Sequence, residues 1–286
     1  LGGVDMKPVT KLMCRDLKRA FGLRTLGIWV VMALFTIYFF FFSNGRRELV
    51  ENNRLEYMSL FLPLIIFGAW AVMAVFFDLI SADRERNVLD CILCSGTTKK
   101  HVFMAKIIAT AIVSLALSFI YLAPITIIVT CLSSAEKAAM IAKYLLPLWG
   151  FIMVFAALGL MISVFARSSK AAMIWSLASG LVLMPRFFVL IPEGIGKILS
   201  LSPQTVEKIS MVSPGIMMEA LSNPNNTSSW TTAVVGFTIG IVALFGIAYM
   251  AFKNQDEYNY GEEGGNTMKI FKKLSSLLLI AALVMA

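Results

Sequence analysis

The chain has 286 residues, of which 58% are hydrophobic and only 15% are charged. A soluble domain is about 45–50% apolar and about 25% charged, so the composition excludes an ordinary soluble domain and indicates a polytopic membrane protein. The net charge of +8 could suggest nucleic acid, but the basic residues flank apolar runs, which is the pattern of membrane topology. We therefore expect the lipid bilayer as a partner and no nucleic acid.

The first 25 residues precede the first long apolar run. Residues 1–5 look like a tag or an upstream leftover before Met6. Residues 6–25 are predicted to form a cytoplasmic interfacial helix, because apolar side chains fall on one side and Lys and Arg cover the rest. Such a helix lies along the membrane surface with its cations among the lipid headgroups.

Residues 26–252 are predicted to form a six-span transmembrane domain, since a helix needs about 20 apolar residues to cross the bilayer. Pro124 should kink the third span, and the small residues Ala156, Ala157 and Gly159 should allow close helix packing in the fourth. The expected spans are 26–43, 58–80, 107–132, 144–166, 171–191 and 231–252.

The end of the chain departs from this pattern. Residues 253–267 are polar and contain several glycines, which predicts a flexible cytoplasmic tail. Residues 268–286 have a basic start, an apolar run and a small-residue end, as a signal peptide does. The run is too short to span comfortably, so this piece is either signal-like or a truncated seventh apolar segment.

Residues 81–106 form the longest strongly polar interruption between two apolar runs in the first half of the chain. Each charge would cost a few kcal/mol at the bilayer centre, so the segment must lie at a membrane face. Acidic and basic residues open it, basic residues close it, and a short amphipathic piece, 88–93, lies between them. A soluble partner could bind it there.

The distribution of basic residues predicts the orientation. Seventeen Lys and Arg lie on the side of residues 81–106 and of both ends of the six-span core, and eight lie on the other side. The positive-inside rule places the richer side in the cytoplasm. We expect a multi-pass protein of the plasma or inner membrane, from a bacterium.

The polar loop opens with Asp83-Arg84-Glu85-Arg86, continues with Leu89-Asp90 and Ile92-Leu93, and ends with Lys99 and Lys106. In this order of residues it resembles the loop of permease subunits of ABC-2 type transporters, which have the G-type exporter fold. In that family an acid-Arg-Glu-basic run follows the second span, and further acidic, apolar and basic positions lead into the third. Asn87-Val88 stands where the family favours Gly-Thr, and Gly96 stands where it favours Pro. The residues that carry the resemblance are Asp83, Arg84, Glu85, Arg86, Leu89, Asp90, Ile92, Leu93, Lys99 and Lys106.

The resemblance implies an all-α membrane fold. It consists of six transmembrane helices with an N-terminal amphipathic elbow helix, a cytoplasmic coupling helix, and short re-entrant helices after span 5. The apolar pieces 195–201 and 211–221 would be those re-entrant helices.

The resemblance also implies partners. Two permease copies, or two homologous permeases, would form the pathway, and a separate ABC ATPase subunit would dock on residues 81–106 and hold ATP and Mg. The coupling residues would be those from Asp83 to Leu93 in the matched positions, excluding Asn87, Val88 and Cys91.

Several kinds of chemistry are not indicated by the sequence. The stretch from Gly194 to Lys197 is the nearest approach to a P-loop, but it lacks the upstream glycine and the Ser or Thr. We therefore expect no ATP hydrolysis by this chain and no bound cofactor. Cys91 and Cys94 could be a redox or metal pair, but a structural zinc site needs four ligands, and His101 is the only histidine. Reduced thiols and no metal are expected.

Arg186, after Pro185, is the one clear charge within a predicted span. It is either a residue of the transport pathway, which would favour an anionic substrate, or a long side chain that reaches the nearby outer interface. Apart from it, the spans lack a chain of ionisable residues, which argues against an ion-coupled transporter.

Two other functions are alternatives to an exporter permease. A membrane-embedded enzyme is disfavoured because catalytic groups are missing from the sequence. A non-transporting integral membrane scaffold or immunity protein could use the same fold, and the sequence excludes it less well. The apolar spans favour a lipid-like or amphipathic cargo.

Overall fold

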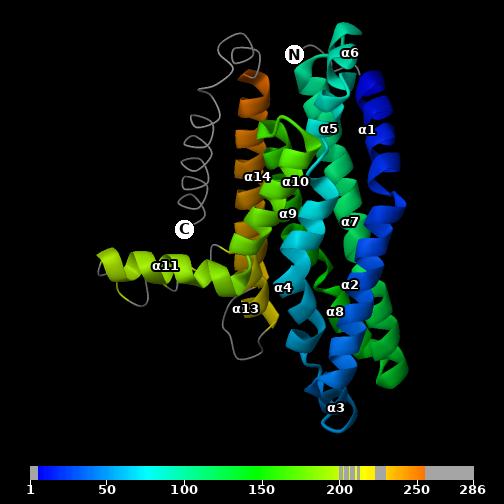
Figure 1. Cartoon of the computed structure of the whole chain (residues 1–286). Coiled ribbons are helices and arrows are strands. Elements are labelled where there is room, and N and C mark those ends of the chain that lie inside the picture. The colour runs from blue at the N-terminus through cyan, green and yellow to red at the C-terminus, as the bar shows by residue number, and fades with distance from the viewer. Residues whose placement is uncertain are drawn as a thin grey trace.

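The computed structural model describes residues 6–199, 213–222 and 230–254, with the single residues 202, 206 and 210. The predictions for residues 1–5 and 268–286, and for nearly all of 253–267, fall outside this part of the chain. The described residues are helical in large part and form an elongated bundle (Figure 1). The first seven helices are α1 (Met6–Ala20), α2 (Leu23–Phe42), α3 (Asn44–Val50), α4 (Tyr57–Phe76), α5 (Ser81–Glu85), α6 (Val88–Cys94) and α7 (Lys99–Leu132). They are followed by α8 (Ala135–Ala142), α9 (Leu145–Phe165), α10 (Ser169–Val182), α11 (Pro185–Leu199), α13 (Pro214–Ser222) and α14 (Trp230–Lys253).

The predicted membrane-spanning fold is confirmed. Within the described ranges, five helical segments are long and apolar enough to cross a membrane, and α10 with α11 would make a sixth if the pair is one span. The five are Leu23–Phe42, Tyr57–Glu85, Lys99–Leu132, Ala135–Phe165 and Ala233–Lys253.

The predicted fifth span is corrected. A straight helix over 171–191 does not form, because the chain breaks after Val182 and a second helix begins at Pro185. The two parts are bent by 74°, and α11 runs across the axis of the bundle in Figure 1. Proline disfavours helical backbone in the residue before it and suits the first position of a new helix, so Pro185 accounts for the break.

The chain between spans also contains more helix than predicted. The charged loop 44–57 includes α3, whose N-cap Ser43 accepts a hydrogen bond from the backbone N–H of Gly45. The loop 133–143 includes α8, whose N-cap Ser134 accepts one from the N–H of Lys137. Serine at these positions satisfies backbone donors that a helix start leaves free.

Helix α9 is the centre of the bundle. It is apolar on every side, and nearly all its residues are buried against α4, α7, α10, α13 and α14. A helix that is hydrophobic all round is buried in this way. Ala156 and Ala157 are fully buried, and Gly159 lies against Phe76 of α4, so the predicted close packing is confirmed.

Replacing Gly159 with Leu should separate α4 from α9. A Cβ at Gly159 would already lie 3.2 Å from Phe76 Cβ, and membrane helices associate through close packing of this kind. We expect a loss of at least about 1 kcal/mol in unfolding free energy, measured by thermal unfolding in detergent. Gly27→Leu is the control, because a Cβ there meets nothing within 4 Å. Equal losses from both changes would contradict the prediction.

Candidate functional site

The polar segment 81–106 lies at one end of the bundle, together with α1 and the start of α7 (Figure 1). We call this the α6 end. The predicted single coupling helix over 83–93 is two short helices, α5 and α6. Asn87 separates them with a left-handed backbone, at φ 55° and ψ 16°. Non-glycine residues adopt this conformation rarely, and asparagine is among those that tolerate it best.

Asp83 does not face solvent. Its carboxylate is buried, and Lys106 of α7 reaches it with an Nζ–Oδ2 distance of 2.5 Å. The same ammonium lies 3.0 Å from Asp16 Oδ2 of α1 and donates a hydrogen bond of 2.7 Å to the Leu79 carbonyl. Asp16 is 0% exposed and Lys106 is 1% exposed. One buried cation therefore joins α1, α5 and α7.

Two arginines of α1 complete this arrangement. Arg15 lies 2.7 Å from Asp83 Oδ2 and 2.9 Å from Asp16 Oδ1. Arg19 lies 3.3 Å from Asp83 Oδ1 and 3.0 Å from Asp78 Oδ2. We call the six side chains Asp16, Asp78, Asp83, Arg15, Arg19 and Lys106 the buried ion cluster. Asp16, Asp83 and Lys106 are its buried centre, and Arg15, Arg19 and Asp78 are partly exposed at its edge.

Arg15 keeps its charge in this cluster. Burial alone would lower the pKa of Arg15, but the carboxylates of Asp16 and Asp83 outweigh that effect and raise it above its ordinary value. The cluster contains three basic and three acidic side chains, so their formal charges balance. Buried charges are tolerated in proteins when they are paired and hydrogen-bonded in this way.

Arg84 and Glu85 bind the turn between α9 and α10. Arg84 donates hydrogen bonds of 2.8 Å to the Ala166 carbonyl and 3.1 Å to the Val164 carbonyl, at the end of α9. Glu85 Oε2 accepts a hydrogen bond of 3.0 Å from the backbone N–H of Ser169, at the start of α10. A cation at a helix C-terminus and an anion at a helix N-terminus both match the helix dipole.

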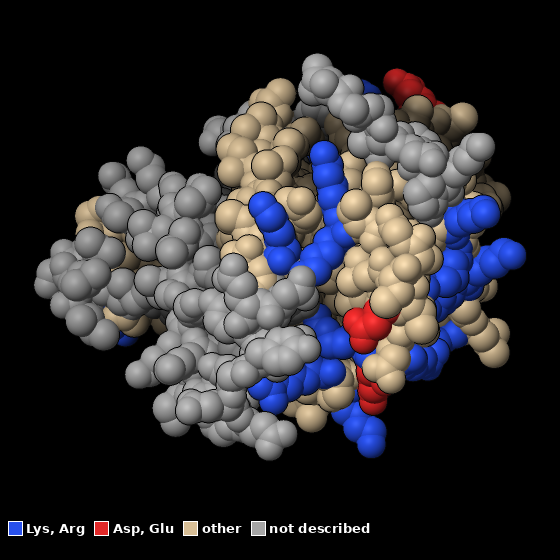
Figure 2. Space-filling model, turned by 90° about the horizontal axis from the view of Figure 1, so that it is seen from above, with Lys and Arg blue, Asp and Glu red and all other residues tan. Residues whose placement is uncertain are grey.

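The remaining predicted coupling residues divide by exposure. Within α6, Leu89 is buried and Ile92 and Leu93 are partly buried, whereas Asp90 of α6 and Arg86 before it are exposed. The apolar side of α6 thus holds it to the bundle, and its polar side faces outward. Figure 2 shows this end from above, with Lys and Arg side chains around a few acidic ones.

Other predicted positions are less informative. The backbone of Arg186 lies in α11, but its side chain falls outside the described residues, so its place in a pathway stays a prediction. Cys91 and Cys94 are both exposed free thiols on α6. Among the described residues, no group of three or more His, Cys, Asp or Glu could hold a metal ion.

The sequence reasoning did not identify Asp16 or the partners of Lys106. One signal could have found Asp16, because it is the single acidic residue between Met6 and Thr25. An isolated acid in a basic helix suggests a specific partner, but which residue it pairs with depends on how α1 packs against α7.

A known protein family matches most of the chain. The family model described as ABC-2 family transporter protein matches residues 14–257, a range that begins in α1 and extends past α14. Among curated proteins, none matched the sequence. The match covers well over half of the chain, including the buried ion cluster and the five membrane-crossing segments found in the described ranges, so the chain belongs to the ABC-2 family of transporter proteins.

Proposed function

We propose that this chain is the permease subunit of an ATP-binding cassette exporter, and that two permease subunits form its translocation pathway. A separate ATPase subunit, which holds ATP and Mg, docks on the α6 end from the cytoplasm. Membership in the ABC-2 family supports a membrane component rather than the ATPase itself. The proposed location is the inner or plasma membrane, with the α6 end in the cytoplasm.

One observation carries the proposal. The outward side of α6 is exposed, whereas the segment that bears it is fixed to the long helices by the buried ion cluster. Lys106 belongs to α7, Arg15 to α1, and Asp78 follows α4. A force applied to α6 would therefore reach three elements of the bundle through short, buried contacts. That is what a docking site must do if it transmits motion.

We propose different tasks for the predicted coupling residues. Arg86 and Asp90 would contact the partner, and their exposure supports this role. Asp83 and Arg84 are bonded within the chain, so they would transmit motion without touching the partner. Leu89, Ile92 and Leu93 would seat α6 on the bundle. Glu85 is exposed but also bound to Ser169, so it could serve both purposes.

The test is a co-purification with the ATPase encoded beside this chain, followed by an ATP turnover assay in nanodiscs. We expect a stable complex that is weakened about tenfold by R86E/D90K, since charges at a docking surface set affinity and partner choice. The matched control is R54E/E56K, which exchanges the same signs of charge in the α3–α4 connection, outside the α6 end.

Two results would reject the proposal. A wild-type chain that recruits no ATPase would favour a scaffold or immunity protein that uses the same fold. A complex whose affinity and turnover are the same in R86E/D90K as in the wild type would show that the ATPase binds elsewhere.

A further inference from the structure

We propose that the turn Arg167-Ser168-Ser169-Lys170, which leads from α9 into the first residues of α10, is the second half of the docking surface, and that it receives acidic side chains of the ATPase subunit. This inference rests on the proposed function and extends it. The first half of the surface is α6. The turn is distant from α6 in sequence, and the sequence motif that suggests coupling does not include it.

Hydrogen bonds join the turn to the coupling segment. Arg84 spans the end of α9 through the Val164 and Ala166 carbonyls, and Glu85 holds the N–H of Ser169. These two neighbouring residues of α5 therefore bind the chain immediately before and within the turn. A partner bound to α6 would therefore also contact the turn, because hydrogen bonds hold the two segments together.

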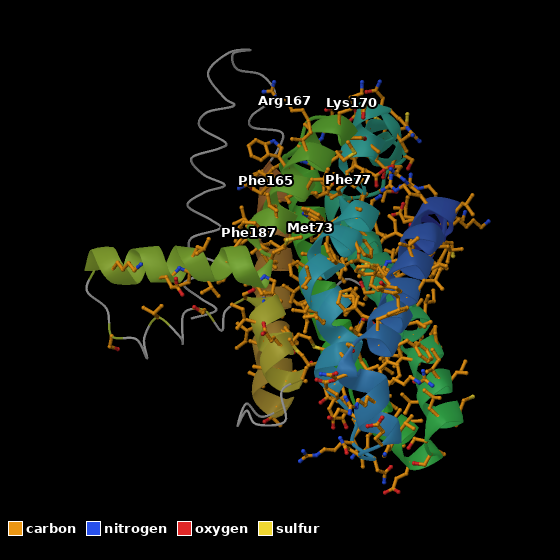
Figure 3. The ribbon with its side chains drawn as sticks, turned by 60° about the horizontal axis from the view of Figure 1, so that its bottom comes forward. Met73, Phe77, Phe165, Arg167, Lys170 and Phe187 are labelled. Atoms are coloured by element: carbon orange, nitrogen blue, oxygen red, sulfur yellow. The ribbon has the colours of Figure 1, made fainter. Side chains whose placement is uncertain are left out.

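The turn is also held in place by its own hydrogen bond and by apolar packing beneath it. Ser168 caps α10, and its Oγ accepts a hydrogen bond of 3.2 Å from the N–H of Ala171. Ala166 and Ala172 on either side are buried against Phe77. Figure 3 shows Arg167 and Lys170 at the tip of this unit, beyond Phe165 and Phe77. A surface that is already ordered loses little conformational freedom when a partner binds.

The charge of the surface indicates the partner's chemistry. Arg167 and Lys170 are exposed, as are Arg86 and Lys100 from the coupling segment and the start of α7. Two acids lie among these four cations, Glu85 and Asp90. A partner surface that is mainly acidic would complement this excess of positive charge and would be drawn to it at long range.

A protein surface fits better than a membrane surface. The headgroups of anionic lipids would repel Glu85 and Asp90, which lie on the same exposed end as the cations. A protein can instead place a few basic groups against those two carboxylates and acidic groups against the rest. The α6 end would thus bind the ATPase by mixed but complementary charge.

The inference is tested with R167E/K170E. Binding of the purified ATPase is measured at low and high salt in nanodiscs of neutral lipid. We expect about tenfold weaker binding at low salt and a smaller dependence on salt, because exposed charge pairs are screened. The matched control is R46E/R54E, which reverses two exposed cations of α3 and the connection after it, outside this surface. Thermal unfolding of both variants shows that they are folded.

The outcomes separate this inference from the proposed function. If the wild type binds and R86E/D90K binds weakly, but R167E/K170E binds as the wild type does, only this inference is overturned. It is also overturned if R167E/K170E differs from the wild type only in nanodiscs that contain anionic lipid, because the turn would then bind headgroups. If the wild type recruits no ATPase, the proposed function is rejected, and this inference is rejected with it.

Discussion

Replacing Lys106 with Met is expected to lower the unfolding free energy by about 3–5 kcal/mol, because Asp16 and Asp83 lose their fully buried cation and keep only the partly exposed Arg15 in common. Lys106 is 1% exposed and lies within 3.0 Å of both Asp16 and Asp83. Removing one partner of a buried charge pair costs far more than the pair contributes as a whole. The loss should appear as a lower melting temperature in detergent.

Two further variants separate the charge from the side chain's volume. Lys100→Met makes the same change at an exposed position of α7 and should leave the melting temperature close to that of the wild type. The double change D16N/K106M removes one carboxylate charge together with the cation, leaves Arg15 and Arg19 facing Asp78 and Asp83, and should recover part of the lost stability. A wild-type melting temperature for Lys106→Met would show that the cluster does not hold this end together.

Replacing Arg84 with Ala should separate docking from coupling. Its two hydrogen bonds to the end of α9 are made by a charged group, and such a bond contributes about 1.5–3 kcal/mol. Without them, α5 is no longer joined to α9 through Ala166 and Val164. We expect the ATPase to bind with nearly wild-type affinity, while transport driven by ATP falls at least about tenfold.

The measurement compares ATPase affinity with transport or with ATP turnover stimulated by the permease. Arg84→Lys keeps the charge but loses the planar fork that reaches two carbonyls, so an intermediate effect is expected. Arg54→Ala, in the connection before α4, is the control. If affinity and transport fall in parallel for Arg84→Ala, then Arg84 contributes to docking and not to transmission.

The long helices could be predicted because a membrane-spanning segment must satisfy its own backbone and be apolar over its whole length. Local signals would have refined the rest. Pro185 is sufficient reason for the break between α10 and α11. Ser43 and Ser134 are the N-caps of α3 and α8, and capping serines are visible in a sequence once a helix is expected to follow.

The candidate site was only partly predictable. The run from Asp83 to Asp90 could be identified as a charged segment at a membrane face, but its charges serve different purposes. Asp83 is buried in an ion cluster, Arg84 caps a distant helix, and Arg86 is exposed. These differences depend on how α1, α7 and α9 pack around α5. That packing cannot be inferred from the order of residues within this segment.

The buried ion cluster has a consequence for the order in which the protein is assembled. Asp83 lies 68 positions after Arg15 and 23 positions before Lys106. Since a chain is synthesised from its N-terminus, both carboxylates that Lys106 neutralises exist before α7 does. Before α7 arrives, only Arg15 and Arg19 of α1 can face the three carboxylates of the cluster, so one negative charge is left over and burial of this end is disfavoured. Insertion of α7, which brings Lys106, is therefore the step that balances the charges at this end of the nascent protein.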